Sequence, residues 1–180
     1  MNIEKMNKEN FDNFISLLRE FKESEKNRYL NSTLINRLKE DAFSINPKYE
    51  VYLGKIGQDW VAYVIIVMLY STLIALPSVS VEEMFVLDSF RSLGIGAAML
   101  EFCIRTVRKK GCGKIEFMVP ARNKKAKKFF EFNEAVLMDM SYYQMDLVGI
   151  KKIGTTPGKI THVDFIRKKR TNKLSLFIPS

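Results

Sequence analysis

The sequence predicts a mixed α and β fold, an α+β or α/β arrangement in which a central mixed, twisted sheet is flanked by helices. Three observations support this prediction. The 180 residues suit one globular domain. Some segments repeat apolar residues with a helical period, while others read as strands. The second half of the chain then runs strand, helix, strand, helix, strand, which favours parallel pairing around residues 79–119.

The individual elements follow from local patterns. Apolar residues at intervals of three or four predict helices, Val, Ile and aromatic runs predict strands, and Gly or Pro marks the turns. The expected elements are strands at 3–6 and 49–56, helices at 10–21 and 31–38 (with Asn31 or Ser32 as the second N-cap), a strand from about residue 60, a strand at 79–87 after a turn at Pro77 and Ser78, a helix at 94–110, a strand at 114–119, a helix at 123–132 and strand-like segments at 136–147.

The longest apolar stretch, residues 61–77, could be mistaken for a membrane span. It has only 17 residues, is interrupted by Ser71 and Thr72, and ends at a proline. A spanning helix needs about 20 apolar residues, and the Val and Ile content favours a strand. We therefore predict a buried core strand here and no membrane partner.

The positive charge is concentrated near the C-terminus. Residues 148–180 carry eight Lys and Arg against Asp164 alone, so they contribute +7 of the net charge of +9, and residues 1–147 contribute +2. We expect residues 1–147 to form the domain and residues 148–180 a basic C-terminal extension. The run Arg167–Arg170 could be a solvated turn between edge strands, a surface for phosphates or an anionic membrane, or part of a dimer contact.

Cysteine and histidine carry no evident chemistry in this sequence. Cys103 falls on the apolar face of its predicted helix, Cys112 lies between glycines, and His162 lies in the extension, far from every motif. No His, Cys and acidic residues have the spacing of a metal site. With two cysteines and no apolar segment in the first residues, the chain reads as a cytoplasmic protein without disulfides.

A glycine loop between a predicted strand and helix is the strongest candidate for a binding site. The first amides of a helix lack internal acceptors and carry the positive end of its dipole, and Gly94 and Gly96 would let a large anion approach them. The first helical turn contains no acidic residue. The Walker sequence is absent. The dinucleotide fingerprint GxGxxG fails at Met99, although Glu116 follows at about the distance of a ribose contact.

The run VLDSFRSLGIGAAML resembles motif A of the GNAT acetyltransferases, (Gln/Arg)-x-x-Gly-x-(Gly/Ala). Arg91, Gly94 and Gly96 occupy the motif positions, and Ser92 stands where many members have glycine. Upstream, VEEMFV resembles the LEDLFV strand of the diamine and polyamine acetyltransferase branch. Downstream, Asn123-x-x-Ala126-x-x-Phe-Phe resembles its N-x-x-A-x-x-F-Y helix, and residues 142–147 resemble a terminal strand.

The resemblance implies the GNAT acyl-CoA N-acyltransferase fold, with acetyl-CoA (coenzyme A) as the cofactor. Its pantetheine arm would run along the strand before the loop, and its pyrophosphate would rest on the loop amides. Basic residues within 122–128 are near enough in sequence to neutralise a 3′-phosphate. The cofactor-binding positions carried over from the family are Met84, Phe85, Val86, Arg91, Ser92, Leu93, Gly94, Ile95, Gly96, Ala97, Asn123, Ala126 and Phe130.

Two acidic residues in the strand are the catalytic candidates. Glu82 matches the glutamate at the acceptor side of the family's strand, so we expect it to act as base or amine anchor, with Glu83 as the second candidate. Strand alternation places these two side chains on opposite faces. A structural ion pair is the alternative role for such a pair. The family's tyrosine falls at Phe130, which cannot donate a proton, so Tyr142 or an ordered water would have to replace it.

Together these features predict an N-acetyltransferase that moves acetyl from acetyl-CoA to a primary amine, such as a small diamine, polyamine or amino-acid-like acceptor. Phe130 leaves open an acetyl-CoA-binding protein with little turnover. The basic extension leaves open an acetyltransferase acting on a docked macromolecule. The expected partners are a small-molecule amine and a second copy in a homodimer. Metal is not expected, and nucleic acid is not favoured because the charge lies mostly in the extension.

Overall fold

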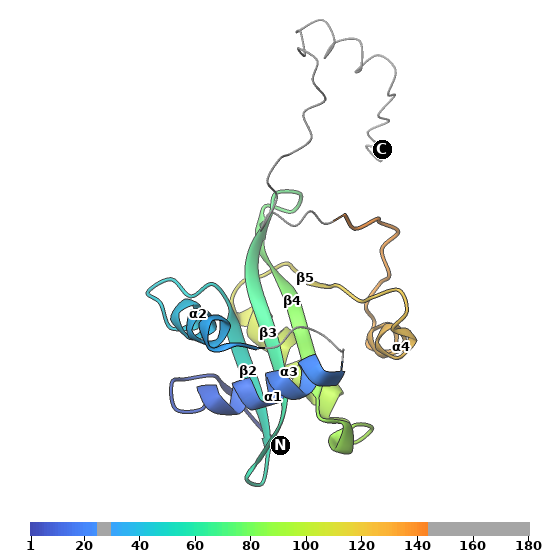
Figure 1. The fold of residues 1–180 in the computed structure, drawn as a ribbon. Helices are drawn as coiled ribbons and strands as arrows, with labels where there is room; N and C mark the ends of the chain where they lie inside the picture. Colours follow the sequence, from blue (N-terminus) through green and yellow to red (C-terminus); the bar gives the residue numbers. More distant parts are fainter. Residues whose placement is uncertain (25–29, 144–180) are drawn as a thin grey trace, which may run out of the picture. The chain divides into compact units, whose positions relative to one another are not determined.

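The computed structural model describes residues 1–24 and 30–143 of the chain (Figure 1). It divides into a first unit, Met1–Leu137, and a second unit, Met138–Ser180, of which residues 138–143 are described. The first unit contains β1 (Asn2–Lys5), α1 (Phe11–Ser24), α2 (Ser32–Ala42), β2 (Glu50–Ile56), β3 (Asp59–Ser71), β4 (Leu76–Val86), the 3₁₀ helix η1 (Asp88–Phe90), α3 (Ile95–Lys109), β5 (Lys114–Phe117) and α4 (Lys124–Phe132). The predicted mixed sheet flanked by helices is therefore confirmed.

The sheet of the first unit runs in chain order, β1-β2-β3-β4-β5. The first three pairings are antiparallel, and β4 and β5 are parallel, from Ser78 opposite Lys114 to Val81 opposite Phe117. The prediction of parallel pairing within residues 79–119 is thus confirmed. Beyond Val81, β4 continues to Val86 without a partner strand on its β5 side in the described part of the chain.

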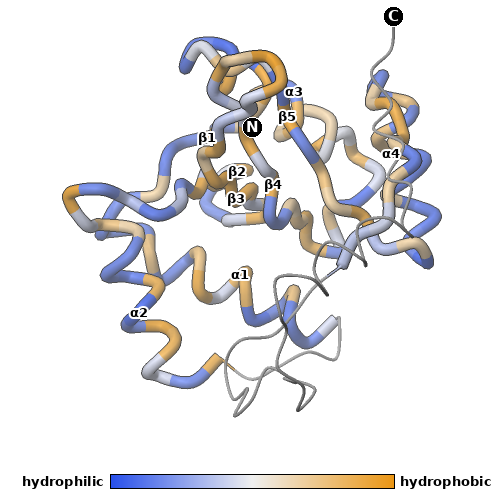
Figure 2. The backbone as a smooth tube through the Cα atoms, turned by 90° about the horizontal axis from the view of Figure 1, so that it is seen from above, coloured by the Kyte–Doolittle hydropathy of each residue, from blue (hydrophilic) through white to orange (hydrophobic). Residues whose placement is uncertain are grey.

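Helices cover both faces of the sheet (Figure 2). On one face, α3 buries Met99 and Cys103 against strand residues such as Val64, and this confirms the predicted core position of Cys103. On the other face, α1 buries Phe14 against Tyr63, whose ring it meets edge-on at a centroid distance of 5.4 Å. The helical period of α1 and the alternation of β3 therefore place their apolar sides in a common core.

The apolar stretch at residues 61–77 contains a turn, so the prediction of one core strand is wrong. β3 ends at Ser71, residues 72–75 turn, and β4 begins at Leu76. Ala75 takes the left-handed φ of 53° that this turn requires. Pro77, predicted as a turn residue, lies in β4 opposite Tyr70, and its carbonyl accepts a hydrogen bond from the Gly113 N–H at 2.9 Å.

Other boundaries agree with expectation to within a few residues, with two exceptions. α2 continues to Ala42, four residues past the predicted end, although its predicted cap is confirmed: the Asn31 side chain accepts the Leu34 N–H at 2.9 Å. Residues 136–143 form no strand, contrary to the prediction. Residues 144–147 and the extension at 148–180, with His162, lie outside the described residues. No helix in the described ranges has the length and apolar character needed to cross a bilayer.

Candidate functional site

A β-bulge in β4 sets the position of Glu82. Ile65 of β3 pairs with Glu83 while Ile66 pairs with Val81, so Glu82 is the extra residue between them. Such a bulge redirects side chains and interrupts the ladder locally. The Glu82 side chain is exposed, and its Oε1 accepts a hydrogen bond from the Ser80 hydroxyl at 3.1 Å. The bulge thus presents one carboxylate to solvent in the middle of an otherwise buried strand.

Glu83 is bound within the protein and lies on the same face as Glu82, because the bulge overrides the strand alternation that predicted opposite faces for these two side chains. Its Oε1 lies 3.0 Å from Nζ of Lys22 on α1, and its Oε2 accepts a hydrogen bond of 2.9 Å from the Tyr63 hydroxyl. Burial and the adjacent Glu83 carboxylate raise the pKa of Tyr63 well above its usual range, so this phenol stays protonated. Glu83 thus forms a structural ion pair, which is the alternative role considered above for these two glutamates.

The outer half of β4 offers backbone groups at an open edge. The Leu87 N–H donates to the Val61 carbonyl at 2.9 Å, which makes these two residues a hydrogen-bonded pair. Antiparallel pairs alternate, so the Val86 and Met84 pairs with β3 are non-hydrogen-bonded, and their N–H and C=O groups point away from β3. These are the residues that the resemblance assigns to pantetheine, and Phe85 between them has its side chain in the α1-side core.

Arg91 closes one end of this edge. Its Nε donates to the Val86 carbonyl at 3.1 Å, its guanidinium pairs with Asp88 at 2.6 Å, and its Cζ lies 5.8 Å from the centroid of the Phe85 ring. The side chain therefore has three partners at the junction between β4 and the glycine loop. Any contact of Arg91 with a ligand phosphate would compete with the Asp88 ion pair.

The glycine loop arranges its amides as an anion-binding nest. Ser92 and Gly94 have left-handed φ angles of 65° and 78°, while Leu93 between them does not. Alternation of this kind turns successive N–H groups toward one side. The N–H groups from Ser92 to Ala97 have no acceptor within the described residues, and the first helical bond of α3 runs from the Ala98 N–H to the Gly94 carbonyl. No side chain caps this helix, so its positive end is available to a ligand.

α4 lies beside the glycine loop. A Cβ built on Gly96 would lie 3.5 Å from the Phe129 ring, so the glycine is in contact range of this helix. Asn123 caps α4 through the Ala126 N–H at 3.0 Å, and Phe130 stacks on Phe117 of β5 at 4.3 Å between centroids. The first turn of α4 contains lysines and no acidic residue. The helix therefore brings positive charge next to the nest.

These features fit the expected acetyl-CoA. The nest can hold a diphosphate, the open β4 edge can pair with an amide-bearing arm, and the lysines of α4 can approach a further phosphate. Leu93 is exposed, which leaves the loop accessible, while Ile95 is buried in the core beneath it. The positions that the resemblance assigns to the cofactor lie in β4, in the glycine loop with the start of α3, and at α4 with its N-cap.

Tyr142, the candidate acid, belongs to the second unit, so its part in catalysis stays a prediction. Its side chain is exposed. Sequence reasoning did not identify Lys22, Tyr63, Ser80 or Asp88 as partners of the site residues. Lys22, Ser80 and Asp88 are polar residues that nothing distinguishes in the sequence. The bulge also left no clear signal in the sequence, because residues 84–87 are all apolar and both faces of this segment are occupied by apolar side chains.

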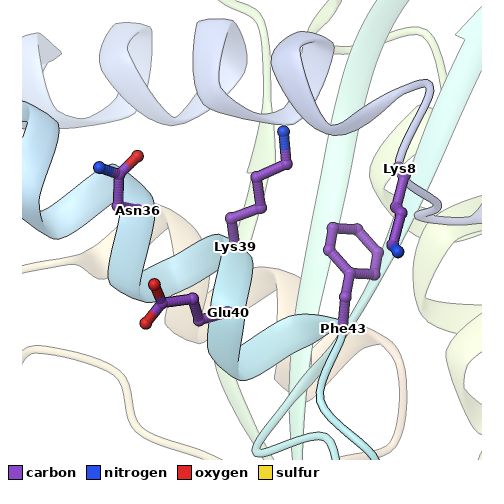
Figure 3. Close-up of a pocket in the computed structure, with 5 residues that line it drawn as sticks. All are labelled: Lys8, Asn36, Lys39, Glu40 and Phe43. Atoms are coloured by element: carbon purple, nitrogen blue, oxygen red, sulfur yellow. The ribbon is translucent and has the colours of Figure 1, made fainter.

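A separate pocket lies between α2 and the turn before α1 (Figure 3). It is lined by Lys8, Asn36, Lys39, Glu40 and Phe43, none of which is a predicted site residue. Within residues 1–24 and 30–143, no group of three or more His, Cys, Asp or Glu side chains could hold a metal ion.

The comparison with protein-family models identifies one family. A sequence model described as the acetyltransferase (GNAT) family matches residues 11–133. No curated protein matches the chain by sequence. Among solved structures, a ribosomal-protein-alanine N-acetyltransferase from Brucella melitensis biovar Abortus is 18% identical, with a TM-score of 0.68 over 81% of this chain and 99% of that one.

Two further solved structures are similar to a comparable extent, the first of them an aminoglycoside acetyltransferase. One, meta-AAC0020 from an uncultured soil metagenomic sample in complex with sisomicin, is 15% identical, with a TM-score of 0.68 over 81% of this chain and 96% of that one. The other, AAC(6′)-Iy in complex with the bisubstrate analogue CoA-S-monomethyl-acetylneamine, is 15% identical, with a TM-score of 0.67 over 81% and 97% of the two chains. At these identities the likeness concerns the fold.

Proposed function

We propose a small primary amine as the acceptor, from the premise that the chain belongs to the GNAT acetyltransferase family and is an acetyl-CoA-dependent N-acetyltransferase. The observation that best supports binding of the acetyl donor is the row of unpartnered N–H groups from Ser92 to Ala97 at the start of α3. When bound, acetyl-CoA supplies an activated acetyl thioester. The chain supplies its binding groups and a base.

The donor would be held by β4, the glycine loop and α4. Backbone groups of Met84 and the N–H of Val86 face the open edge and would pair with the pantetheine arm, while the loop amides would bind the pyrophosphate. The Val86 carbonyl already accepts from Arg91, so we assign only its N–H to the donor. Lysines of α4 would meet the 3′-phosphate.

Glu82 is the residue we propose as base. An alkylammonium group has a pKa of about 10.4, so less than about 1% of the amine is neutral at pH 7, and only the neutral form attacks a thioester. The Glu82 carboxylate is exposed at the bulge, directly before the open edge, where it can accept the proton from the amine or from an intervening water. Glu83, which is bound by Lys22 and Tyr63, would position the strand.

The charges of the site favour an acceptor with a single amine over a polyamine. Lys22 neutralises Glu83, and Arg91 pairs with Asp88, which leaves Glu82 as the acidic group that an ammonium ion would meet at the bulge. A long polycation prefers several uncompensated carboxylates. A similar structure carries the name of a ribosomal-protein-alanine N-acetyltransferase, whose named acceptor is an amino acid. We therefore propose an amino-acid-like acceptor or the amine of a compact molecule.

The test is release of CoA thiol from acetyl-CoA across a panel of amines: a diamine, spermidine, single amino acids, an alanine-ended peptide and an aminoglycoside. We expect turnover with at least one member and a loss of about 10²-fold or more in kcat for Glu82→Gln, with unchanged CoA affinity by calorimetry. Glu101→Gln, which alters an exposed pair with Arg105 on α3, is the matched control. Absence of turnover with every amine, or full activity of Glu82→Gln, would contradict the proposal.

A further inference from the structure

The end of the β3–β4 hairpin is an exposed apolar surface. Met68, Leu69 and Tyr70 of β3 expose 43, 44 and 63% of their surface, and Leu73 at the tip exposes 92%. Figure 1 shows the paired ends of the two strands extending beyond the helices. The sequence contains no charged residue from position 61 to 81. Exposed apolar surface of this kind marks interaction sites, because soluble proteins seldom leave it open.

The β4 side of this hairpin end is paired within the chain, although Ile74 and Leu76 still expose 41 and 44% of their surface. A Cβ on Gly113 would lie 2.8 Å from Leu76 and 2.9 Å from Ile74, so these two side chains pack directly on the turn that follows α3. The Gly113 N–H bonds to the Pro77 carbonyl at 2.9 Å, and β5 begins its pairing opposite Ser78. The backbone edge left open at this end is therefore that of β3.

The β3 side is an open strand edge. The pairing of β2 with β3 begins at Glu50 opposite Ile66, and in the described residues no strand pairs with β3 beyond this point on that side. The segment before β2 is held elsewhere, since the Lys48 N–H bonds to the Asp41 carbonyl at 3.1 Å and the Tyr49 hydroxyl bonds to the Leu38 carbonyl at 2.7 Å. An uncharged, apolar edge without a protecting lysine or proline pairs readily with another strand.

The backbone of Tyr70 points toward this open edge. Tyr70 is opposite Pro77, which has no N–H and whose carbonyl turns to Gly113, so the two residues form a non-hydrogen-bonded pair. In such a pair the N–H and C=O of the partner point away from it. The same alternation turns the Met68 backbone outward. Met68 and Tyr70, two residues apart, therefore each present one N–H and one C=O at the open edge.

We propose that this edge is the interface of a homodimer, in which Tyr70 of one copy pairs antiparallel with Tyr70 of the second. A two-fold axis at this residue lets each Tyr70 exchange one N–H and one C=O with its counterpart, so the segment is complementary to itself. The outward side chains are apolar and bury one another in the dimer. Residues 61–81 contain no charged residue, so two copies that pair at this edge bring no like charges together there.

Sedimentation velocity of the full chain over a range of concentrations tests the interface. We expect a dimer for the natural sequence and, for Tyr70→Lys and Tyr70→Glu separately, a dissociation constant raised by about tenfold or more, because like charges would face each other across the axis. An equimolar mixture of the two variants should recover the dimer through the opposite charges. Phe132→Lys, at an exposed apolar position on α4, should leave the dimer unchanged.

The mixture also separates loss of the interface from loss of folding, because a misfolded variant would not regain a dimer with its partner. A chain that remains a monomer at all concentrations would overturn the proposal and would assign the surface to another protein or to a membrane. A dimer that both Tyr70 variants leave intact would overturn it as well and would move the contact to another part of the chain, such as residues 148–180.

Discussion

The Tyr63 hydroxyl on β3 donates a hydrogen bond of 2.9 Å to the Glu83 carboxylate on β4, and the same carboxylate pairs with Lys22 of α1 at 3.0 Å. This connection joins two strands and a helix on the side of the sheet opposite α3. Since Glu83 follows the bulge residue directly, the connection also fixes where the bulge lies along β4. Under the proposed function the two neighbouring glutamates have different tasks, since Glu83 is bound within the protein and the exposed Glu82 would meet the acceptor.

The first prediction separates these tasks. Glu83→Gln should lower the free energy of unfolding by about 1–3 kcal/mol, because it leaves a partly buried Lys22 without its charge partner. Glu82→Gln should change stability by less than about 0.5 kcal/mol, because its side chain is exposed. Urea unfolding of both variants measures this, and kcat should show the reverse ranking. Larger loss of kcat in a fully stable Glu83→Gln variant would make Glu83 the base.

The bulge also shows what the sequence could not reveal about this strand. Val79 and Val81 face α3, and after the bulge Met84 and Val86 face the same side, so the apolar parity changes within β4. The sequence alone does not show that change, because residues 84–87 are all apolar and do not reveal which of them face α3. The partners of Glu83 are not visible, because Lys22 and Tyr63 are 61 and 20 residues away and reach it only through the packing of α1 and the register of β3.

The second prediction concerns the left-handed residues of the glycine loop. Ser92 has a φ of 65°, where a side chain is disfavoured, and Gly94 has a φ of 78° with open space around the position of a Cβ. Ser92→Gly should raise the free energy of unfolding by about 0.5 kcal/mol, and Gly94→Ala should lower it by about 1 kcal/mol, since the strain of about 1–2 kcal/mol is partly offset by the entropy of the unfolded chain.

Ser92→Ala is the control for this pair, because it removes the hydroxyl and keeps the Cβ. Thermal or urea unfolding should find it no more stable than the natural sequence. A gain in stability for Ser92→Ala equal to that for Ser92→Gly would show that the hydroxyl, and not the backbone angle, is the unfavourable feature. Calorimetry should also find weaker CoA binding to Gly94→Ala, since the nest depends on this conformation.

Some features of the glycine loop can be predicted from local sequence, and others depend on tertiary structure. The motif residues Arg91, Gly94 and Gly96 identify the loop, and a helix start that lacks a capping side chain identifies its anion-binding end. The position of α4 beside the glycine loop could not be predicted from local sequence. It depends on the contact between Gly96 and Phe129 and on the stacking of Phe130 against Phe117, which join separate elements. The turn at 72–75 was missed because none of its residues is Gly, Pro, Asn or Asp.

The third prediction tests the residue at the family's tyrosine position. The Phe130 ring is held by its stack on Phe117, so Phe130→Tyr should add a hydroxyl without moving the ring. If the site lacks a proton donor for the departing thiolate, initial rates of thiol release should rise by about tenfold or more. Phe132→Tyr, at an exposed position on the same helix, should leave the rate unchanged. An unchanged rate for Phe130→Tyr would mean that another group, such as Tyr142 or a water, already donates the proton.

The fourth prediction concerns Glu50, which joins β2 to β1 and to the end of α3. Its Oε1 accepts from Lys110 at 2.8 Å, and its Oε2 accepts from the Tyr52 hydroxyl at 2.6 Å and lies 3.4 Å from Lys5. Burial alone would raise the pKa of this carboxyl, but the bonds from Lys110 and Tyr52 and the charge of Lys5 lower its pKa below the usual value. A lowered pKa in the folded state means that ionised Glu50 stabilises the fold.

Because the pKa is lowered on folding, this stabilisation is fully present above the unfolded pKa of about 4.3 and is lost as the pH falls through the folded pKa. Glu50→Gln should therefore lower the free energy of unfolding by about 1–2 kcal/mol at pH 7, and its difference from the natural sequence should shrink below about pH 4.3. Urea unfolding at pH 7 and at a series of acidic values measures both. Glu101→Gln removes an exposed ion pair, so its free energy of unfolding should differ little from that of the natural sequence at pH 7 or at acidic pH. A difference for Glu50→Gln that persists at low pH would show that shape and not charge is the stabilising feature.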